Sequence, residues 1–304
     1  MKSMLWIGVI ALVLAAAGPR RQDAPAAVLV KVQGSVQIVP SGGSPAPAAV
    51  GARLSVGDEV RPSQGAEAVV VHRTGRTQVV KEALVIEAPD GSGQGDMFTR
   101  TVRVFAQAAA SDARRTGNRQ GMIRPLPGGP APISPKNGVK VTSTRPTFTW
   151  FRSEGATGYR IQVRGEGGRP MRFEVGPDTV FQLPEDVELP RGVPHRWTVA
   201  PLQGRPVKEE AFVVMGDEDR AQLEGAFTAI EEMGLDPEDD GRLLLAVVYT
   251  DLGLLYEAAE VIAALESAGG LSADVFLLKG EVLDALGHFD EARAAFDKAD
   301  EMLR

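Results

Sequence analysis

The chain has 304 residues, of which 43% are hydrophobic and 24% charged, and these proportions are ordinary for a soluble globular protein of two or three domains. It contains no cysteine, which excludes disulfides, thiolate metal sites, cysteine nucleophiles and a lipid-modified cysteine anchor. Its net charge of −7 is unevenly placed, because residues 217–304 hold 22 acidic and 6 basic side chains and residues 1–216 carry a net +9. This asymmetry favours contacts between unlike surfaces, within one molecule or with a partner, while a solvated acidic face is the plainer interpretation.

Residues 1–23 are expected to direct export. One lysine precedes an apolar run at residues 4–17, and these fourteen residues fit a signal-peptide core but fall short of the roughly 20 needed to span a bilayer. Ala15 and Ala17 provide a small-x-small cleavage signal. The basic pair at 20–21 keeps an uncleaved anchor as the alternative, which would be the expected contact with a membrane. Either segment predicts that the working domains lie in the periplasm or cell envelope.

Residues 27–88 show the alternation of apolar and other residues that predicts β-strands. The alternating apolar positions are Val28, Val30, Val32, Val36, Ile38, 69–71, Val79 and Val80. A hairpin turn is expected at residues 74–76, where a threonine, a glycine and an arginine separate two of these runs.

The glycines and apolar residues of this region resemble those of the FecR-type domain of bacterial envelope proteins. The matching residues are Gly34, Val36, Gly51, Leu54, Gly57, Asp58, Val60, Gly65, Ala68, Val70 and Gly75. The run at residues 54–60 is the most family-specific part. The resemblance implies a small all-β domain over residues 24–96. In it, Asp58 is expected to hydrogen-bond nearby backbone amides and fix the bend between two strands.

Residues 97–134 are expected to form a basic helix followed by a proline-rich linker. Residues 97–115 have helical spacing, with Val102, Phe105 and Ala109 on one face. The candidate basic surface consists of Arg100, Arg103, Arg114 and Arg115, and Arg119 and Arg124 follow it. A solvated helix face is the preferred interpretation, and binding to anionic lipid or a wall polymer is the alternative. No nucleic-acid partner is expected, because the arginines are not interleaved with aromatic residues.

Residues 135–216 have the short alternating segments of a β-sandwich. Seven strands are expected, at residues 140–142, 146–151, 159–164, 171–175, 180–183, 195–200 and 211–214. The motifs at 146–150, 156–159 and 195–199 resemble a fibronectin type III or related immunoglobulin-like module. Trp150 and Trp197 could form a sugar-stacking platform, but tryptophans in strand register are more often core residues, and we expect core.

Residues 217–304 contain a repeated spacing of 34 residues, a period typical of helix–turn–helix arrays. Leu245, Ala246, Tyr249, Gly253, Leu255 and Ala258 align with Lys279, Gly280, Leu283, Gly287, Phe289 and Ala292. The pattern resembles the tetratricopeptide repeat. Small residues at 246 and 280 would let paired helices approach, and the glycines at 253 and 287 would allow sharp turns. A helix around residues 223–233 is expected to add a third layer that caps the array.

The resemblance implies that the first helix of each repeat lines an inner groove that binds another chain. The candidate groove residues are Leu243, Val247, Asp251, Leu277, Glu281 and Asp284. This partly anionic lining would suit a basic peptide or helix. A sharper hypothesis is that the basic segment at residues 100–124 docks there, from the same or a neighbouring molecule.

No catalytic or metal-binding motif accompanies these modules. The three histidines, at 72, 195 and 288, fall in three different modules, and no HExxH cluster, nucleophile elbow, P-loop or dinucleotide fingerprint occurs. We therefore expect no enzyme, no cofactor and no metal.

The sequence predicts a multidomain chain, β then α: a small all-β FecR-type domain, an immunoglobulin-like β-sandwich and α-helical tetratricopeptide-like hairpins. The first functional hypothesis is an envelope scaffold that binds a protein or peptide, basic in character, through the repeats. The second is a module that binds cell-wall polysaccharide or peptidoglycan through the β-domains. The third is a structural spacer that binds nothing.

Overall fold

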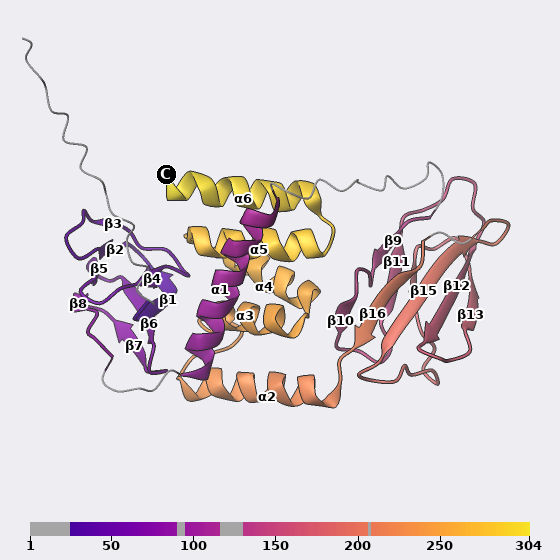
Figure 1. The fold of residues 1–304 in the computed structure, drawn as a ribbon, viewed down its shortest axis with the longest axis horizontal. Helices are drawn as coiled ribbons and strands as arrows, with labels where there is room; N and C mark the ends of the chain where they lie inside the picture. The colour runs from indigo at the N-terminus through magenta and orange to yellow at the C-terminus, as the bar shows by residue number, and fades with distance from the viewer. Residues whose placement is uncertain (1–24, 90–94, 116–129, 206–207) are drawn as a thin grey trace, which may run out of the picture.

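The computed structural model describes residues 25–89, 95–115, 130–205 and 208–304, except for the side chains of residue 96 and residues 111–115. The expectations for residues 1–23 and for Arg119 and Arg124 lie outside this part of the chain. Figure 1 shows the helical repeats in the centre of the molecule, with a small β module on one side and a β-sandwich on the other. The order along the chain is therefore β module, one long helix, sandwich and repeats.

The first β module consists of two four-stranded sheets with a shared core. One has the order β4-β1-β6-β7 and the other β3-β2-β5-β8. The strands are β1 (Ala27–Gln33), β2 (Val36–Val39), β3 (Ala46–Pro47), β4 (Arg53–Leu54), β5 (Glu59–Pro62), β6 (Glu67–His72), β7 (Thr77–Val80) and β8 (Leu84–Val85). Leu29, Leu54 and Ile86 are fully buried between the sheets. The expected strands and the hairpin at 74–76, between β6 and β7, are confirmed.

Asp58 holds the turn before β5, as expected. Its carboxylate accepts hydrogen bonds from the backbone N–H of Ser41 at 3.0 Å and from that of Ser55 at 2.8 Å. The aspartate is 8% exposed, so these two bonds satisfy a buried charged group and tie two loops together.

The middle of the chain is a two-sheet β-sandwich. Its five-stranded sheet has the order β10-β16-β15-β12-β13 and its three-stranded sheet the order β14-β11-β9. The strands are β9 (Pro132–Ser134), β10 (Val139–Val141), β11 (Thr147–Trp150), β12 (Tyr159–Gly165), β13 (Met171–Val175), β14 (Val180–Gln182), β15 (Pro194–Pro201) and β16 (Glu210–Val214). All seven expected strands are present, and Trp150 and Trp197 are core residues, 1% and 0% exposed.

Strand β9 was not expected, because it falls in the segment interpreted as a linker. The prolines of this segment predicted a stiff spacer, and β9 contains one of them, Pro132. The structure places β9 at an edge, where it pairs only with β11 among the described strands, and this position tolerates Pro132. Residues 132–134 therefore belong to the sandwich, and the linker prediction is wrong for them.

The last 88 residues form five helices, α2 (Asp217–Glu232), α3 (Arg242–Leu252), α4 (Leu255–Ala268), α5 (Ala273–Ala285) and α6 (Phe289–Leu303). Gly253 and Gly287 lie in the turns of the hairpins α3–α4 and α5–α6, and both have a positive φ. Gly280 on α5 lies directly against the ring of Phe296 on α6, so a side chain there would meet the ring. Helix α2 packs on α3 as a further layer, as expected.

Helix α1 (Asp96–Arg115) is present as expected but is not a solvated connector. It lies across α3 and α5 (Figure 1), and Phe98, Phe105 and Ala108 are 3%, 1% and 0% exposed. The expected apolar face is rotated from the real one, since Ala109 is exposed. Thr101 is buried instead, and its hydroxyl donates to the carbonyl of Met97 at 2.9 Å, which satisfies the polar group inside the interface.

Candidate binding groove of the helical repeats

The apolar groove residues lie beneath α1. Leu243 and Val247 on α3 are fully buried and share one hydrophobic cluster with Phe98 and Phe105 of α1. Leu277 on α5 is 7% exposed and belongs to a second cluster with Ala108. The helices that carry the expected groove residues, α3 and α5, are therefore covered by a helix of the same chain.

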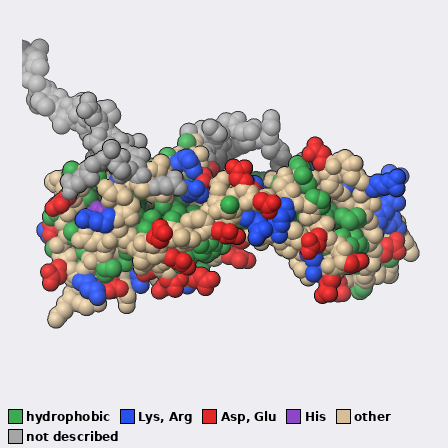
Figure 2. All heavy atoms as spheres, turned by 90° about the horizontal axis from the view of Figure 1, so that it is seen from below, with side chains coloured by type: hydrophobic (Ala, Val, Ile, Leu, Met, Phe, Trp, Pro, Cys, Tyr) green, Lys and Arg blue, Asp and Glu red, His purple; other side chains and the backbone are tan. Residues whose placement is uncertain are grey.

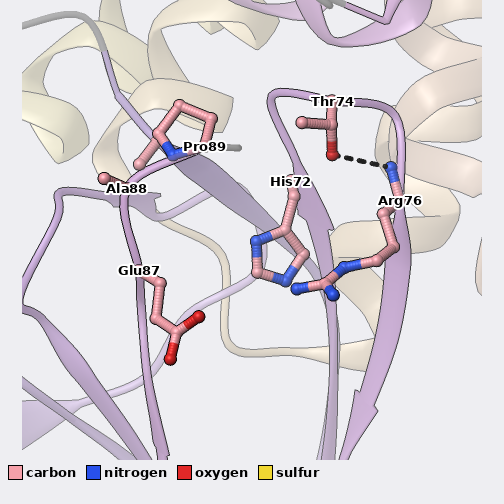
Figure 3. Close-up of a pocket in the computed structure, with 7 residues that line it drawn as sticks. His72, Thr74, Arg76, Glu87, Ala88 and Pro89 are labelled. Atoms are coloured by element: carbon pink, nitrogen blue, oxygen red, sulfur yellow. Dashed lines mark hydrogen bonds between the residues drawn. The ribbon is translucent and has the colours of Figure 1, made fainter. Parts of the chain in front are cut away.

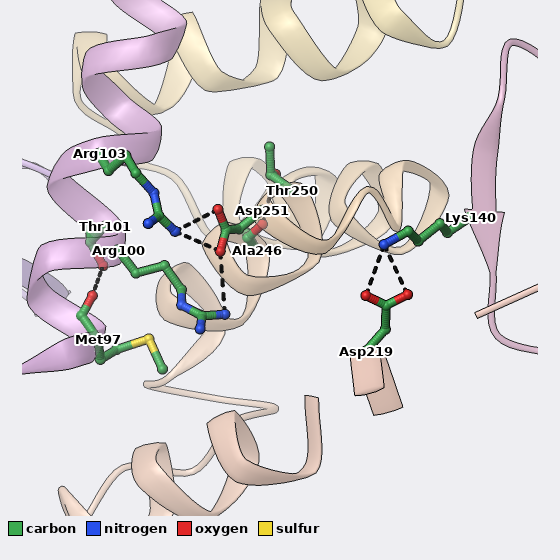
Figure 4. A network of polar contacts seen from close by, with 9 residues as sticks. All are labelled: Met97, Arg100, Thr101, Arg103, Lys140, Asp219, Ala246, Thr250 and Asp251. Carbon is green, nitrogen blue, oxygen red and sulfur yellow. Dashed lines mark hydrogen bonds and ion pairs between the residues drawn. The ribbon is translucent and has the colours of Figure 1, made fainter. Parts of the chain in front are cut away.

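A carboxylate at the end of α3 holds the basic side of α1 (Figure 4). Arg103 Nη2 donates to both oxygens of Asp251, at 2.7 and 2.8 Å. Arg100 Nη1 lies 3.4 Å from the same carboxylate. The Arg100 side chain is 14% exposed and that of Arg103 51%, so the first pair is the better shielded from solvent. One acidic group thus orients two arginines one turn apart.

The remaining candidate residues are distributed differently. Glu281 is half-buried on α5, and Asp284 is exposed one turn further along the same helix. The backbones of Arg114 and Arg115 belong to the last turn of α1, but their side chains lie outside the described part of the chain. The structure therefore sets Leu243 and Val247 in one cluster with α1 and Leu277 in another, and it joins Asp251 to Arg100 and Arg103. Asp284 is exposed on α5.

Sequence reasoning missed a cavity of about 370 Å³ beside the groove, between the first turns of α1 and the middle of α2. It is lined by Met97, Arg100, Gln222, Gly225, Ala226, Ala229 and Met233. The methionines and small residues that line this cavity are also typical of packed helix faces. The sequence therefore carries no signal that distinguishes a packed face from an open one.

The repeats also hold the two β modules through hydrogen bonds to backbone groups. In the first module, Val50 N–H donates to Gly270 O at 2.8 Å and Ser272 N–H donates to Val50 O at 2.9 Å. On the other side, Lys140 N–H donates to Gly253 O at 3.1 Å, and Asn137 Nδ2 donates to Ala285 O at 3.1 Å. The sandwich thus contacts both turns of the 34-residue period.

Ion pairs reinforce these junctions. Arg53 of the first module pairs with Asp274 at 2.9 Å, and Lys140 Nζ lies 2.9 Å from the carboxylate of Asp219 (Figure 4). Burial raises the pKa of Asp274, and the Arg53 guanidinium opposes that shift. The basic front and the acidic helical part of the chain therefore meet inside one molecule, which is one of the arrangements that the charge asymmetry left open.

A second cavity, of about 270 Å³, lies in the first β module (Figure 3). Its polar lining includes His72, Thr74, Arg76 and Glu87. His72 Nε2 is 3.2 Å from Gln78 Oε1, and burial, followed by the charge of Arg76, lowers the pKa of this histidine. The described residues bring no three His, Asp or Glu side chains close enough to hold a metal ion.

No described helix combines the length and apolar character needed to cross a membrane. No protein-family model and no curated protein matches the sequence. Among solved structures, the FN1–FN3 domains of chicken CNTN1 align over 60% of this chain and 54% of their own, with 11% identity and a TM-score of 0.23. This chain therefore spans about half of that fragment.

Two further solved structures align with the chain. A two-domain fibronectin type III segment of chicken tenascin aligns over 58% of this chain and 80% of its own, with 15% identity and a TM-score of 0.21. A β-1,2-glucanase from Parabacteroides distasonis aligns over 91% of this chain and 49% of its own, with 12% identity and a TM-score of 0.23. TM-scores this low carry no argument about shared fold or function.

Proposed function

We propose that this protein is a non-enzymatic interaction scaffold that works outside the cytoplasm, in a bacterial cell envelope. In this proposal the first module is of FecR type, the sandwich is a fibronectin type III-like module, and the helices are tetratricopeptide-like repeats. The repeats bind a partner chain that supplies a basic amphipathic helix.

One observation gives the main support to the binding of a basic amphipathic helix by the repeats. The groove holds a helix of this kind in α1, through a buried apolar stripe and through the contacts of Arg103 and Arg100 with Asp251. A partner helix with the same features would meet the same groups. Because α1 occupies the groove, a partner helix must displace α1 before it can bind. The apparent affinity of the partner is therefore the intrinsic affinity multiplied by the fraction of molecules in which the groove is open.

A labelled peptide with the sequence of residues 96–115 tests this proposal. We expect it to bind the intact chain weakly, and to bind at least about tenfold more tightly when Arg100→Glu and Arg103→Glu loosen the chain's own helix. Adding Asp251→Lys to that variant should remove the gain. Arg220→Glu, a charge reversal of an exposed arginine on α2, is the matched control and should leave peptide binding unchanged. No saturable binding to either chain would contradict the proposal.

A photo-reactive residue tests the same idea in cells. At position 284, an exposed site on α5 that the sequence assigns to the groove, we expect a crosslink to a separate polypeptide. At position 297, on the exposed side of α6, we expect none. Equal labelling at the two positions would mean that the groove is not the contact surface.

A further inference from the structure

The outer face of the five-stranded sheet carries a group of arginines that the groove does not use. Arg160 and Arg164 on β12 and Arg196 on β15 alternate with buried residues, Arg172 on β13 alternates with half-buried ones, and all four are exposed. Figure 2 shows Lys and Arg side chains gathered at the sandwich end of the molecule, while many Asp and Glu side chains lie along the helical part. We call the four residues the arginine face.

Two of these arginines stand directly opposite each other. Arg164 on β12 is the register partner of Arg196 on β15. Like charges at such positions are destabilising. Glu209 relieves part of this repulsion, at 2.9 Å from Arg164 and 3.3 Å from Arg196, but one carboxylate is shared between two guanidinium groups.

The other two arginines add to the excess of positive charge. Arg160 pairs with Glu174 at 3.3 Å, in a contact whose two side chains are 43% and 64% exposed. Arg172 Nε donates to the amide oxygen of Gln162 at 3.4 Å. Four arginines therefore share two carboxylates on this face. Gln162 also lies opposite Thr198, which places an amide and a hydroxyl between the charged rows.

We infer that the arginine face binds a polysaccharide that carries carboxylate groups. Guanidinium groups bind carboxylates in a bidentate manner, and the side chains of Gln162 and Thr198 can donate to and accept from sugar hydroxyls. Because a strand rises about 3.3 Å per residue and strands lie about 4.8 Å apart, the four arginines cover a flat area roughly 13 Å long. An extended polymer with repeated charges can contact several of them at once.

Two other occupants fit the face less well. A neutral sugar would need exposed aromatic rings, but Trp150 and Trp197 are both in the core. The acidic helices of a second copy would match the charge. However, the carboxylates of α2 occur at 217–219, 224, 231 and 232, and a rigid helix presents only some of them to a flat sheet.

Calorimetry with a defined alginate oligomer tests the inference, with dextran as the neutral control. The intact chain should bind alginate, should not bind dextran, and should lose alginate at high salt. Arg160→Gln with Arg172→Gln should weaken binding about tenfold, which corresponds to about 0.7 kcal/mol for each exposed contact. Arg220→Gln with Lys298→Gln removes the same charge from exposed sites on α2 and α6 and should change the affinity less than about twofold.

Three outcomes would overturn the inference: no saturable alginate binding, equal weakening by the two double variants, or equal binding of dextran. Salt-sensitive self-association that the Arg160→Gln, Arg172→Gln variant abolishes, without alginate binding, would assign the face to a second copy instead. Asp251→Asn should leave alginate binding unchanged, because Asp251 lies outside the arginine face. A failure of the alginate inference would therefore leave the proposal about the groove untouched.

Discussion

Arg103 on α1 and Asp251 on α3 are 148 positions apart in the sequence, and two hydrogen bonds of 2.7 and 2.8 Å join them. The pair helps to hold α1 against α3 within the same chain. The basic helix and the acidic groove, which composition alone could place in one molecule or two, thus meet within one molecule.

Asp251→Asn should destabilise the protein by about 1–2 kcal/mol, because the carboxylate contacts two guanidinium groups and one of them, on Arg100, is largely shielded from solvent. Arg103→Gln should cost about 0.5 kcal/mol, since its side chain is half exposed. Urea unfolding followed by helical circular dichroism measures both. Lys298→Gln, which removes an exposed pair with Glu301, is the control, and a loss for Asp251→Asn no larger than for this variant would contradict the account.

Gly280→Ala should destabilise the repeats by about 1–3 kcal/mol, because the added Cβ would meet the ring of Phe296 and force α5 and α6 apart. Gly225→Ala on α2 is the matched control, since nothing lies within 4 Å of its Cβ position. In that open helix interior alanine should stabilise by about 0.5–1 kcal/mol. Opposite signs of the two thermal shifts are expected, and an unchanged or raised melting temperature for Gly280→Ala would mean that glycine at 280 is not needed for close packing.

The periodic parts of the fold could be predicted from the sequence. Alternation at period two located the strands, and the 34-residue spacing located two helix hairpins whose turn glycines and small residues have the expected places. Both signals are local, so the residues of a single segment are enough to locate its strand or helix hairpin. The strand that was missed, β9, contains Pro132, and an edge position that tolerates proline is a property of the assembled sheet.

The candidate site could be predicted only in part. The groove residues and the basic helix were found separately, but their contact depends on the fold of the whole chain. The real buried face of α1 includes Thr101, whose burial becomes acceptable through a bond to the Met97 carbonyl that no hydrophobicity pattern contains. The arginine face was missed because Arg164 and Arg196 become neighbours only through strand register.

Gly51→Ala should loosen the junction between the first β module and the repeats. Gly51 has φ +84° and lies directly against Val275, so alanine adds backbone strain and a steric clash. Gly65 has φ +78° with open space around it, so Gly65→Ala is the control that adds backbone strain without a clash. This strain should destabilise the protein by about 1–2 kcal/mol. We expect Gly51→Ala to cost about 1–3 kcal/mol more. Hydrogen exchange at the amides of Val50 and Ser272 should accelerate in the first variant and not in the second.

His72 should make the stability of the first β module depend on pH. Burial, and then the charge of Arg76, lowers the pKa of His72 in the folded state, so the unfolded chain binds the proton more readily. Stability is therefore complete above the unfolded-state pKa, about 6.5, and falls as the pH decreases through that value toward the lower folded-state pKa. His72→Gln cannot titrate, so its unfolding free energy should match the wild type at pH 7.5 to within about 0.5 kcal/mol and exceed it at pH 5. Denaturant titrations at both pH values measure the difference, and parallel pH profiles for the two proteins would show that this histidine does not couple protonation to folding.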